Sequence, residues 1–156
     1  MPRHADPSAD LPPAIPYDIA PQIRDTCLCL HLQRAARVVA RGFDEALRPL
    51  GLTNGQFSLL TALHRPVPAS IGDLSALLGM DRTTLTAALK PLARRGLVSI
   101  VVDTGDKRGR RVALTPAGRD VLRDAVPIWR KTHRAIERRL DGADPDRVRA
   151  GLRALS

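Results

Sequence analysis

The chain has 156 residues, 25 Lys and Arg against 16 Asp and Glu, a formal net charge of +9 and a pI near 11.1. A protein this basic typically meets a polyanion, most often nucleic acid. Aromatic residues make up only 3% of the chain, too few for a surface on which single-stranded bases stack. The sequence has no apolar stretch of membrane-spanning length and no signal-peptide core near Met1, so we expect a cytoplasmic protein with no membrane partner.

The positive charge is concentrated in one segment. Residues 82–111 contain eight basic and two acidic residues, whereas residues 1–81 contain seven and eight, and residues 112–156 contain ten and six. A charge that served only solubility would be spread more evenly. The 82–111 window therefore indicates a local binding surface for a polyanion.

The N-terminal part predicts an arm followed by a long helix. Six of the 13 prolines lie in the first 21 residues, which favours an extended or disordered segment without helix or sheet. From Ile23 to Leu50, apolar residues recur every three or four positions and predict one amphipathic helix. Gly51 should end this helix, and Thr53 or Asn54 should cap the next one.

Two short helices joined by a glycine turn come next, an arrangement typical of a helix-turn-helix. Ser70 and Asp73 are spaced to cap the first helix, Gly79 to end it, and Asp81 to cap the second. The apolar face of the second helix should be core, and it is formed by Leu85, Leu89 and Leu92.

The opposite face of the second helix combines small hydroxylated residues with cations: Arg82, Thr83, Thr84, Thr86, Ala87, Lys90 and Arg94. Short side chains let a helix backbone approach the major groove, and their hydroxyl and methyl groups contact phosphates and base edges. An ordinary solvated helix face explains each residue singly, but it does not explain why the basic window begins here. Pro91 should loosen or kink this helix near Ala87, because it removes one N–H.

A hairpin with a charged tip is predicted directly after this helix. Residues 97–102 are apolar and rich in β-branched side chains, residues 111–114 alternate, and DTGDKRGR lies between them. A hairpin in this position completes a winged helix, whose wing places arginine in the minor groove.

The C-terminal part predicts a long helix over residues 117–140, interrupted at Pro127, and a last short helix opened by Asp144 and Pro145. Their apolar faces have no second core of their own, so we expect a homodimer in which the first and last helices pair. A two-fold protein implies a pseudo-palindromic DNA operator with half-sites roughly 34–36 Å apart. The expected regions are an arm at 1–21, a dimerisation helix at 22–50, a DNA-binding domain at 51–115 and dimerisation helices at 116–156.

With these elements in this order, residues 23–155 resemble the MarR family of transcriptional regulators. The most specific match is the wing pattern Asp106, Arg108 and Arg111, followed by Leu114–Thr115 and Gly118. The resemblance implies a mainly α fold with a small β-wing, in which Asp106 braces the wing, Arg108 enters the minor groove, and Arg111 contacts a phosphate or the wing. The expected DNA contacts are Arg82, Thr83, Thr84, Thr86, Lys90, Arg94, Asp106, Arg108, Arg110 and Arg111.

Members of this family mostly repress transcription and release DNA when a small ligand binds or a cysteine is oxidised. Cys29 lies where the hydroperoxide-sensing branch places its reactive cysteine, and a helix N-terminus favours the thiolate. The tyrosines of that branch would fall near Gln33, Phe43 and Asn54, which carry no phenol. Cys27 and Cys29 should point to different faces of one helix and so not bridge, and buried cysteine is often only a small hydrophobe.

A small anionic or aromatic effector between the dimer helices and the winged helix is the more general expectation, with charge from His31, Arg34, Arg37 and His64. Cys27 and His31 have metal-ligand spacing, but no third ligand is near in sequence, so we expect no metal and no cofactor. Each of these residues is equally well explained as part of a solvated helix face.

The sequence argues against three classes other than a ligand-released repressor. The sequence has no glycine-rich phosphate loop, no paired carboxylates in an apolar setting and no nucleophile elbow, so we do not expect an enzyme. A sequence-indifferent DNA-compacting protein would spread its charge over the surface. A module that had lost DNA binding would not be expected to keep Arg82, Lys90, Arg108 and Arg111. A thiol-based peroxide sensor acting through Cys29 or Cys27 stays open as an alternative mechanism.

Overall fold

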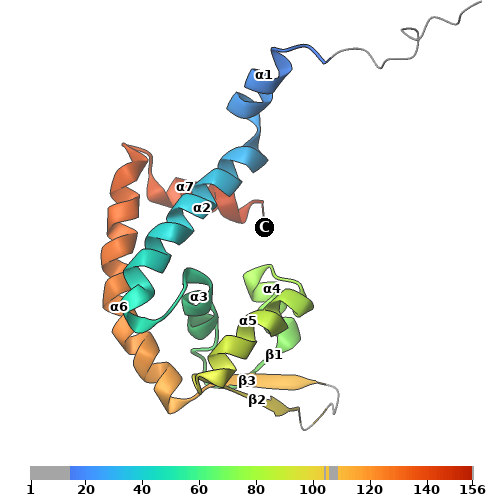
Figure 1. Cartoon of the computed structure of the whole chain (residues 1–156), viewed down its shortest axis with the longest axis vertical. Coiled ribbons are helices and arrows are strands. Elements are labelled where there is room, and N and C mark those ends of the chain that lie inside the picture. The colour runs from blue at the N-terminus through green and yellow to red at the C-terminus, as the bar shows by residue number, and fades with distance from the viewer. Residues whose placement is uncertain (1–14, 104, 106–108, 156) are drawn as a thin grey trace, which may run out of the picture. The chain divides into compact units, whose positions relative to one another are not determined.

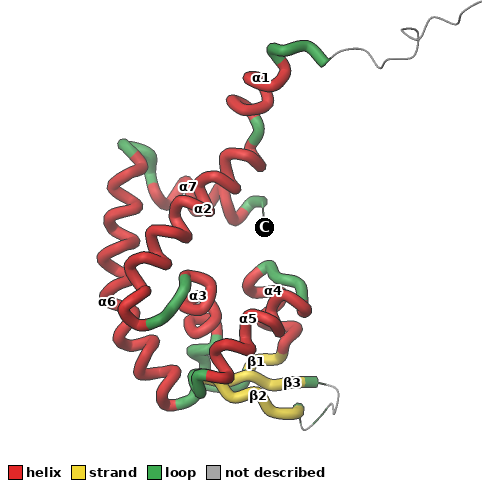
Figure 2. Tube along the Cα trace, in the orientation of Figure 1, coloured by secondary structure: helices red, strands yellow, loops and turns green. Residues whose placement is uncertain are grey.

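The computed structural model describes residues 15–103, 105 and 109–155, which form a mainly helical chain with one small antiparallel sheet (Figures 1 and 2). The predicted fold class is confirmed. The chain divides into two compact units, residues 1–37 and residues 38–156.

The N-terminal unit contains α1 (Ile19–Thr26) and the beginning of α2 (Leu28–Leu47), so the expected single helix from Ile23 onward was wrong. The two helices are separated at Cys27, whose backbone is extended, with φ −73° and ψ 106°. The amide of Cys27 donates to Ile23 O at 2.9 Å and closes α1, whereas its carbonyl accepts the amide of His31 at 3.1 Å and opens α2. Cys27 and Cys29 therefore do not lie on two faces of one helix.

The expected arm also contains helix, because α1 begins at Ile19. Pro21 lies in the first turn of α1, where a missing N–H costs no intrahelical hydrogen bond. At its other end α2 tightens into a 3-10 turn over Arg48–Leu50, since Pro49 has no N–H to continue the α-helix. Gly51, with φ 63°, then ends the helical segment as expected.

The described part of the unit over residues 38–156 contains five further α-helices: α3 (Asn54–Ala62), α4 (Ile71–Leu78), α5 (Arg82–Arg94), α6 (Pro116–Glu137) and α7 (Pro145–Arg153). A 3-10 turn over Arg138–Leu140 follows α6. Of the two candidates for the cap of α3, Thr53 is the cap, and it forms a capping box with Gln56. The capping box of Ser70 with Asp73 at the start of α4 confirms the expected cap. Pro91 and Pro127 lie inside α5 and α6 without ending them, so the expected interruption at Pro127 was wrong.

The sheet has the strand order β1–β3–β2, with both pairings antiparallel. Strands β2 (Val98–Val102) and β3 (Arg110–Leu114) form the expected hairpin, with Ile100 opposite Val112. Strand β1 (Ala69–Ser70) pairs with the other edge of β3. Its two residues are too few to give an alternating pattern, so β1 was not expected from the sequence.

One core joins the helix-turn-helix to the sheet. Its least exposed side chains come from different elements: Leu60 of α3, Leu74 of α4, Leu85 and Leu92 of α5, and Val112 of β3, all fully buried. Gly118 allows α6 to start against the hairpin, because a Cβ there would lie 2.0 Å from Leu97 O. Helix α5 is therefore held against the core near both of its ends, by Leu85 and by Leu92.

Candidate nucleic-acid interface and ligand cavity

Burial of one face of α5 determines which side chains the other face presents. Leu85, Leu89 and Leu92 are no more than 1% exposed, as predicted. The six α5 residues assigned to DNA are all exposed: Arg82, Thr83, Thr84, Thr86, Lys90 and Arg94. The helix thus separates an aliphatic face from a cationic, hydroxyl-bearing face.

Two of the three hydroxyls on this face are already donating. Thr84 Oγ1 donates to Asp81 Oδ2 at 2.6 Å, and Thr86 Oγ1 donates to Arg82 O at 2.7 Å. In this arrangement both hydroxyls remain acceptors for donors on base edges, such as exocyclic amino groups. Thr83 makes no side-chain hydrogen bond to another described residue, so its hydroxyl is available both to donate and to accept.

The N-terminus of α5 is held by Asp81. Its Oδ1 accepts the amide of Thr84 at 2.8 Å, which is the expected cap. The hydrogen bond from the Thr84 hydroxyl, followed by that from its amide, lowers the pKa of the Asp81 carboxyl below its ordinary value. The cap therefore stays ionised and stabilises the helix end at neutral pH.

Three cations on α5 form no ion pair with the described part of the chain. Among the described residues, none of Arg82, Lys90 and Arg94 lies within ion-pair distance of a carboxylate. Arg82 also lies close to the start of α4, since a Cβ built on Gly72 would be 3.7 Å from its Nη2. These charges are available to neutralise phosphates.

The base of the wing is braced by Asp103, a residue that the sequence analysis did not single out. Asp103 Oδ2 pairs with Arg111 Nε at 2.5 Å, and Asp103 Oδ1 accepts the amide of Gly105 at 2.9 Å. Arg111 is thereby engaged within the wing, one of its two expected roles. Arg110 is exposed at the start of β3. Asp106 and Arg108 lie outside the described residues.

The C-terminus of α5 is tied to the end of α2 by Arg95. Its Nη1 donates to Gly51 O at 2.5 Å, and its Nη2 donates to Leu50 O at 3.1 Å. A second tie joins α2 to α3, because Asp44 Oδ1 accepts the amide of Asn54 at 2.6 Å. No spacing rule identifies Arg95 from sequence, because its partners lie 44 and 45 residues away.

A mostly apolar cavity of about 700 Å³ lies among α3, α4 and α6. Its apolar lining includes Phe57, Leu122 and Trp129, and its polar lining includes His64 and the cationic Arg130. Trp129 stacks on His133 with ring centroids 4.9 Å apart, which fixes one wall. Sequence reasoning selected His64 but missed Arg130, although residues 122, 126, 129 and 130 follow helical spacing.

The remaining candidate sensing residues lie in the N-terminal unit. Cys29 is exposed in the first turn of α2 and accepts a hydrogen bond from Gln33 Nε2 at 3.2 Å, whereas Cys27 is half-buried. His31 Nε2 lies 3.3 Å from Asp25 O, and Arg34 is exposed. None of these four residues lines the 700 Å³ cavity.

Residues 15–103, 105 and 109–155 contain no group of three or more His, Cys, Asp or Glu placed to hold a metal ion. No helix in this part of the chain has the length and apolar character to cross a membrane.

A helix-turn-helix with a free cationic face, followed by a β-hairpin, defines a winged-helix DNA-binding protein. The comparisons agree with this geometry: the MarR family model matches residues 50–109. The chain belongs to the MarR family, whose members regulate transcription by binding DNA and are not enzymes.

Three similar proteins illustrate the relationship. The transcriptional regulator MosR of M. tuberculosis, solved in complex with DNA, is 39% identical, with a TM-score of 0.75 over 83% of this chain and 92% of that one. The transcriptional repressor CouR, bound to a 23-mer DNA duplex, is 28% identical, with a TM-score of 0.70 over 85% and 92%. The transcriptional activatory protein BadR of Rhodopseudomonas palustris is 36% identical over 97 residues, which span 60% of this chain and 55% of BadR.

Proposed function

We propose that this protein is a homodimeric, sequence-specific transcriptional repressor that binds a pseudo-palindromic operator and is released by a small ligand. The observation that carries the proposal is the exposed face of α5, which keeps Arg82, Lys90 and Arg94 without acidic partners among the described residues. Such a face costs electrostatic self-repulsion unless a polyanion neutralises it.

We assign base reading to the N-terminal half of α5 and phosphate contact to its C-terminal half. Thr83, Thr84 and Thr86 present acceptors and methyl groups that suit base edges, whereas Lys90 and Arg94 present charge. In the wing, Arg108 reaches the minor groove, Asp106 braces the tip, and Arg110 contacts a phosphate. The internal ion pair of Arg111 supports a structural role for that residue in positioning the wing.

Apolar side chains left in solvent support the homodimer. In α7, Val148 and Leu152 are 38% and 45% exposed, and Leu155 just beyond it is 64% exposed. They recur at helical spacing, so they form one stripe that a second copy of the chain buries. In the N-terminal unit, Ile23 and Leu28 are also left in solvent, at 52% and 67% exposure.

The proposed effector is a small anionic aromatic or acyl compound bound in the 700 Å³ cavity. A volume of this size suits a drug-sized ligand, and a mostly apolar lining with a few polar groups is typical of such sites. Arg130 supplies the cationic group that would orient a carboxylate, and His64 supplies a ring nitrogen for a hydrogen bond. The cavity lies against α4, the first helix of the helix-turn-helix, so occupancy bears directly on the position of α5.

The test is DNA binding to the promoter beside the protein's own gene, with a reporter under that promoter. Footprinting should protect a symmetric site, and Arg108→Ala should lose affinity without change in dimer mass or helix content. Protection of the whole fragment would instead indicate DNA compaction. CouR is a repressor and BadR is an activatory protein, so the reporter has to decide the direction of regulation. Reporter expression should rise when the gene is deleted, because we propose a repressor, and a fall would indicate an activator.

A second candidate mechanism is a thiol switch at Cys29, favoured by its exposure in the first turn of α2, where an oxidant can reach the sulfur. Organic hydroperoxide would then release wild-type protein from DNA but leave Cys29→Ser bound. Equal behaviour of the two proteins would leave only the ligand-released mechanism.

A further inference from the structure

The exposed face of α6 changes its charge character halfway along the helix. In the N-terminal half, Arg123 pairs with Asp120 at 2.8 Å and with Asp124 at 3.1 Å, so this part of the face has its own counter-charges. The C-terminal half and the residue that caps it carry four exposed cations at helical spacing, which we call the α6 cationic face: Arg130, Lys131, Arg134 and Arg138.

Within the described part of the chain, the α6 cationic face has no counter-charge. None of its four side chains lies within ion-pair distance of a carboxylate there, and Arg134 Nε instead donates to Arg130 O at 3.3 Å. The acidic residue of the same stretch, Glu137, pairs with Arg149 of α7 at 2.7 Å. Arg130, Arg134 and Arg138 are four residues apart, and like charges at this spacing destabilise a helix. A bound polyanion would remove this repulsion.

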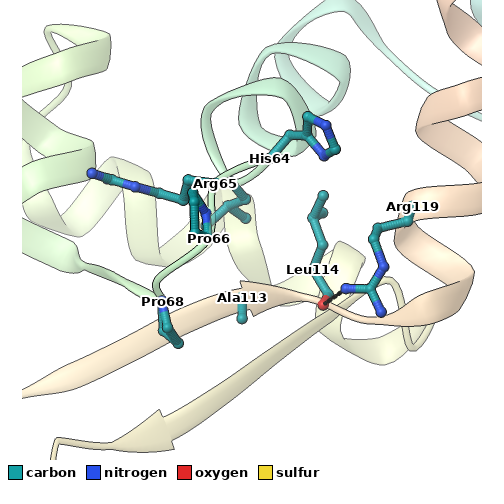
Figure 3. Close-up of a pocket in the computed structure, with 8 residues that line it drawn as sticks. His64, Arg65, Pro66, Pro68, Ala113, Leu114 and Arg119 are labelled. Carbon is teal, nitrogen blue, oxygen red and sulfur yellow. Dashed lines mark hydrogen bonds between the residues drawn. The ribbon is translucent and has the colours of Figure 1, made fainter.

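The α6 cationic face lies at the end of α6 that is remote from the wing. Figure 3 shows Arg119, near the start of the helix, donating to Leu114 O at 3.1 Å, which attaches this end of α6 to strand β3. At about 1.5 Å per residue, Lys131 and Arg138 lie about 18 Å and 28 Å further along the helix axis. Figure 1 shows α6 leading away from the sheet toward α7 over this length. The chain thus has a second cationic surface, separate from the one on α5.

The composition of this face favours a nucleic-acid backbone over a protein or a membrane surface as its partner. Protein interfaces depend on apolar and aromatic anchors, and membrane-surface helices insert large apolar side chains. Helix α6 is described throughout, and none of its large apolar side chains is exposed. Phosphate contacts, in contrast, need only exposed cations, which release counterions from a duplex whatever its sequence.

We propose that the α6 cationic face binds the phosphate backbone of a second DNA duplex, so that one protein molecule bridges two segments of DNA. The first segment is held by the exposed face of α5, so bridging rests on the proposed function, whereas the α6 contact is a separate site. The arginines present several donors to phosphate oxygens, and Lys131 adds a point charge. Phosphate contacts carry no sequence information, so a duplex of any sequence should serve as the second segment.

The test is a two-step capture followed by biolayer interferometry. Full-length protein is loaded on an immobilised fragment of the promoter beside its own gene, and a duplex of unrelated sequence is then supplied from solution. Wild type should capture this second duplex. The triple variant Lys131→Gln/Arg134→Gln/Arg138→Gln should load like wild type but capture about tenfold more weakly, with the slope of log K against log salt reduced by about 3. Arg130 is left unchanged because it also lines the 700 Å³ cavity.

Two control variants separate the face from net charge and from side-chain shape. Arg41→Gln/Arg48→Gln/Arg147→Gln removes three exposed cations elsewhere and should capture like wild type. Arg134→Lys/Arg138→Lys keeps the charge and should also capture. The Tm of the triple glutamine variant should not fall, because Gln has a helix propensity like that of Arg and the repulsion is reduced. If its Tm fell, Arg134→Gln alone would replace it, with a slope lower by about 1.

Four results would overturn the proposal. These are loading without capture by wild type, equal capture by the triple glutamine variant, equal loss in the variant that removes cations elsewhere, and stronger binding of polyglutamate or of anionic lipid vesicles than of duplex in the second step. The loading step tests the proposed function by itself. Equal loading on the promoter fragment and on unrelated DNA would contradict sequence-specific repression, and the capture result would still decide whether α6 binds a second duplex.

Discussion

Replacing Arg95 by alanine should destabilise the protein without removing any side chain from the exposed cationic face of α5. The guanidinium donates to Gly51 O at 2.5 Å and to Leu50 O at 3.1 Å. These carbonyls belong to the end of the 3-10 turn that follows α2, where a cation also opposes the partial negative charge of the helix end. The substitution removes both hydrogen bonds at once.

The expected loss follows from hydrogen bonds made by a charged donor. Each such bond contributes about 1.5–3 kcal/mol when well shielded. Arg95 is exposed, so water replaces part of this energy and we expect a total loss of about 1–2 kcal/mol. For a chain of this length, that loss lowers Tm by about 2–8 °C. Arg95→Lys should lose less, because an ammonium keeps the charge but cannot bind both carbonyls as a fork.

Thermal denaturation at a fixed protein concentration measures the effect, since dimerisation makes Tm depend on concentration. Arg94→Ala is the matched control: Arg94 is the adjacent residue, it is exposed, and its side chain has no hydrogen-bond partner among the described residues. Its stability should stay within about 0.5 kcal/mol of wild type, while its DNA affinity falls. Equal Tm values for the Arg94 and Arg95 variants would refute the stabilising role of the Arg95 contacts.

Three further predictions concern charge, packing and capping. Lys90→Ala should weaken binding to every DNA sequence alike and reduce the slope of log K against log salt by about 1, measured by fluorescence anisotropy; a lost preference at one base pair would make Lys90 a base reader instead. Gly118→Ala should cost about 2–3 kcal/mol in chemical denaturation, because its Cβ would lie 2.0 Å from Leu97 O, whereas Gly55→Ala, with its nearest neighbour 4.0 Å away, should be neutral or slightly stabilising. The pKa of the Asp81 carboxyl is lowered by hydrogen bonds in the first turn of α5. Its charge therefore stabilises the fold fully above the ordinary pKa of 3.8, and this stabilisation is lost as pH falls through the lower pKa of the folded protein. The Tm difference between wild type and Asp81→Asn should shrink over that range, and a constant difference would contradict the assignment.

The elements that the sequence predicted well are those with a local chemical cause. The caps of α4 and α5 act within one turn of chain, so they could be predicted from spacing alone. They are the Ser70–Asp73 capping box, Gly79 at the end of α4 and Asp81 at the start of α5. The buried face of α5 was equally readable, because three leucines at helical spacing have one consistent solution. Most of the helix-turn-helix was therefore predictable.

The errors and omissions arose where distant residues decide the outcome. The break at Cys27 interrupts a pattern that is helical on both sides, and periodicity alone does not detect a single extended residue. Arg95 donates hydrogen bonds to carbonyls 44 and 45 residues away. Arg111 pairs with Asp103 only once the hairpin brings the two side chains together. The DNA contacts assigned to Asp106 and Arg108 stay predictions, since these residues lie outside the described ranges.

Helix α5 and its C-cap carry two kinds of cation with separate tasks, and this separation bears on how the protein would respond to the proposed ligand. Lys90 and Arg94 face solvent, whereas Arg95 ties the end of α5 to the last turn after α2. Asp44 ties the same part of α2 to the start of α3, which lines the large cavity. A displacement of this end of α2 must therefore break these hydrogen bonds or carry α3 and α5 with it. Because fully buried leucines pack α5 into the core, we expect the proposed ligand to shift the position of the helix rather than its internal structure.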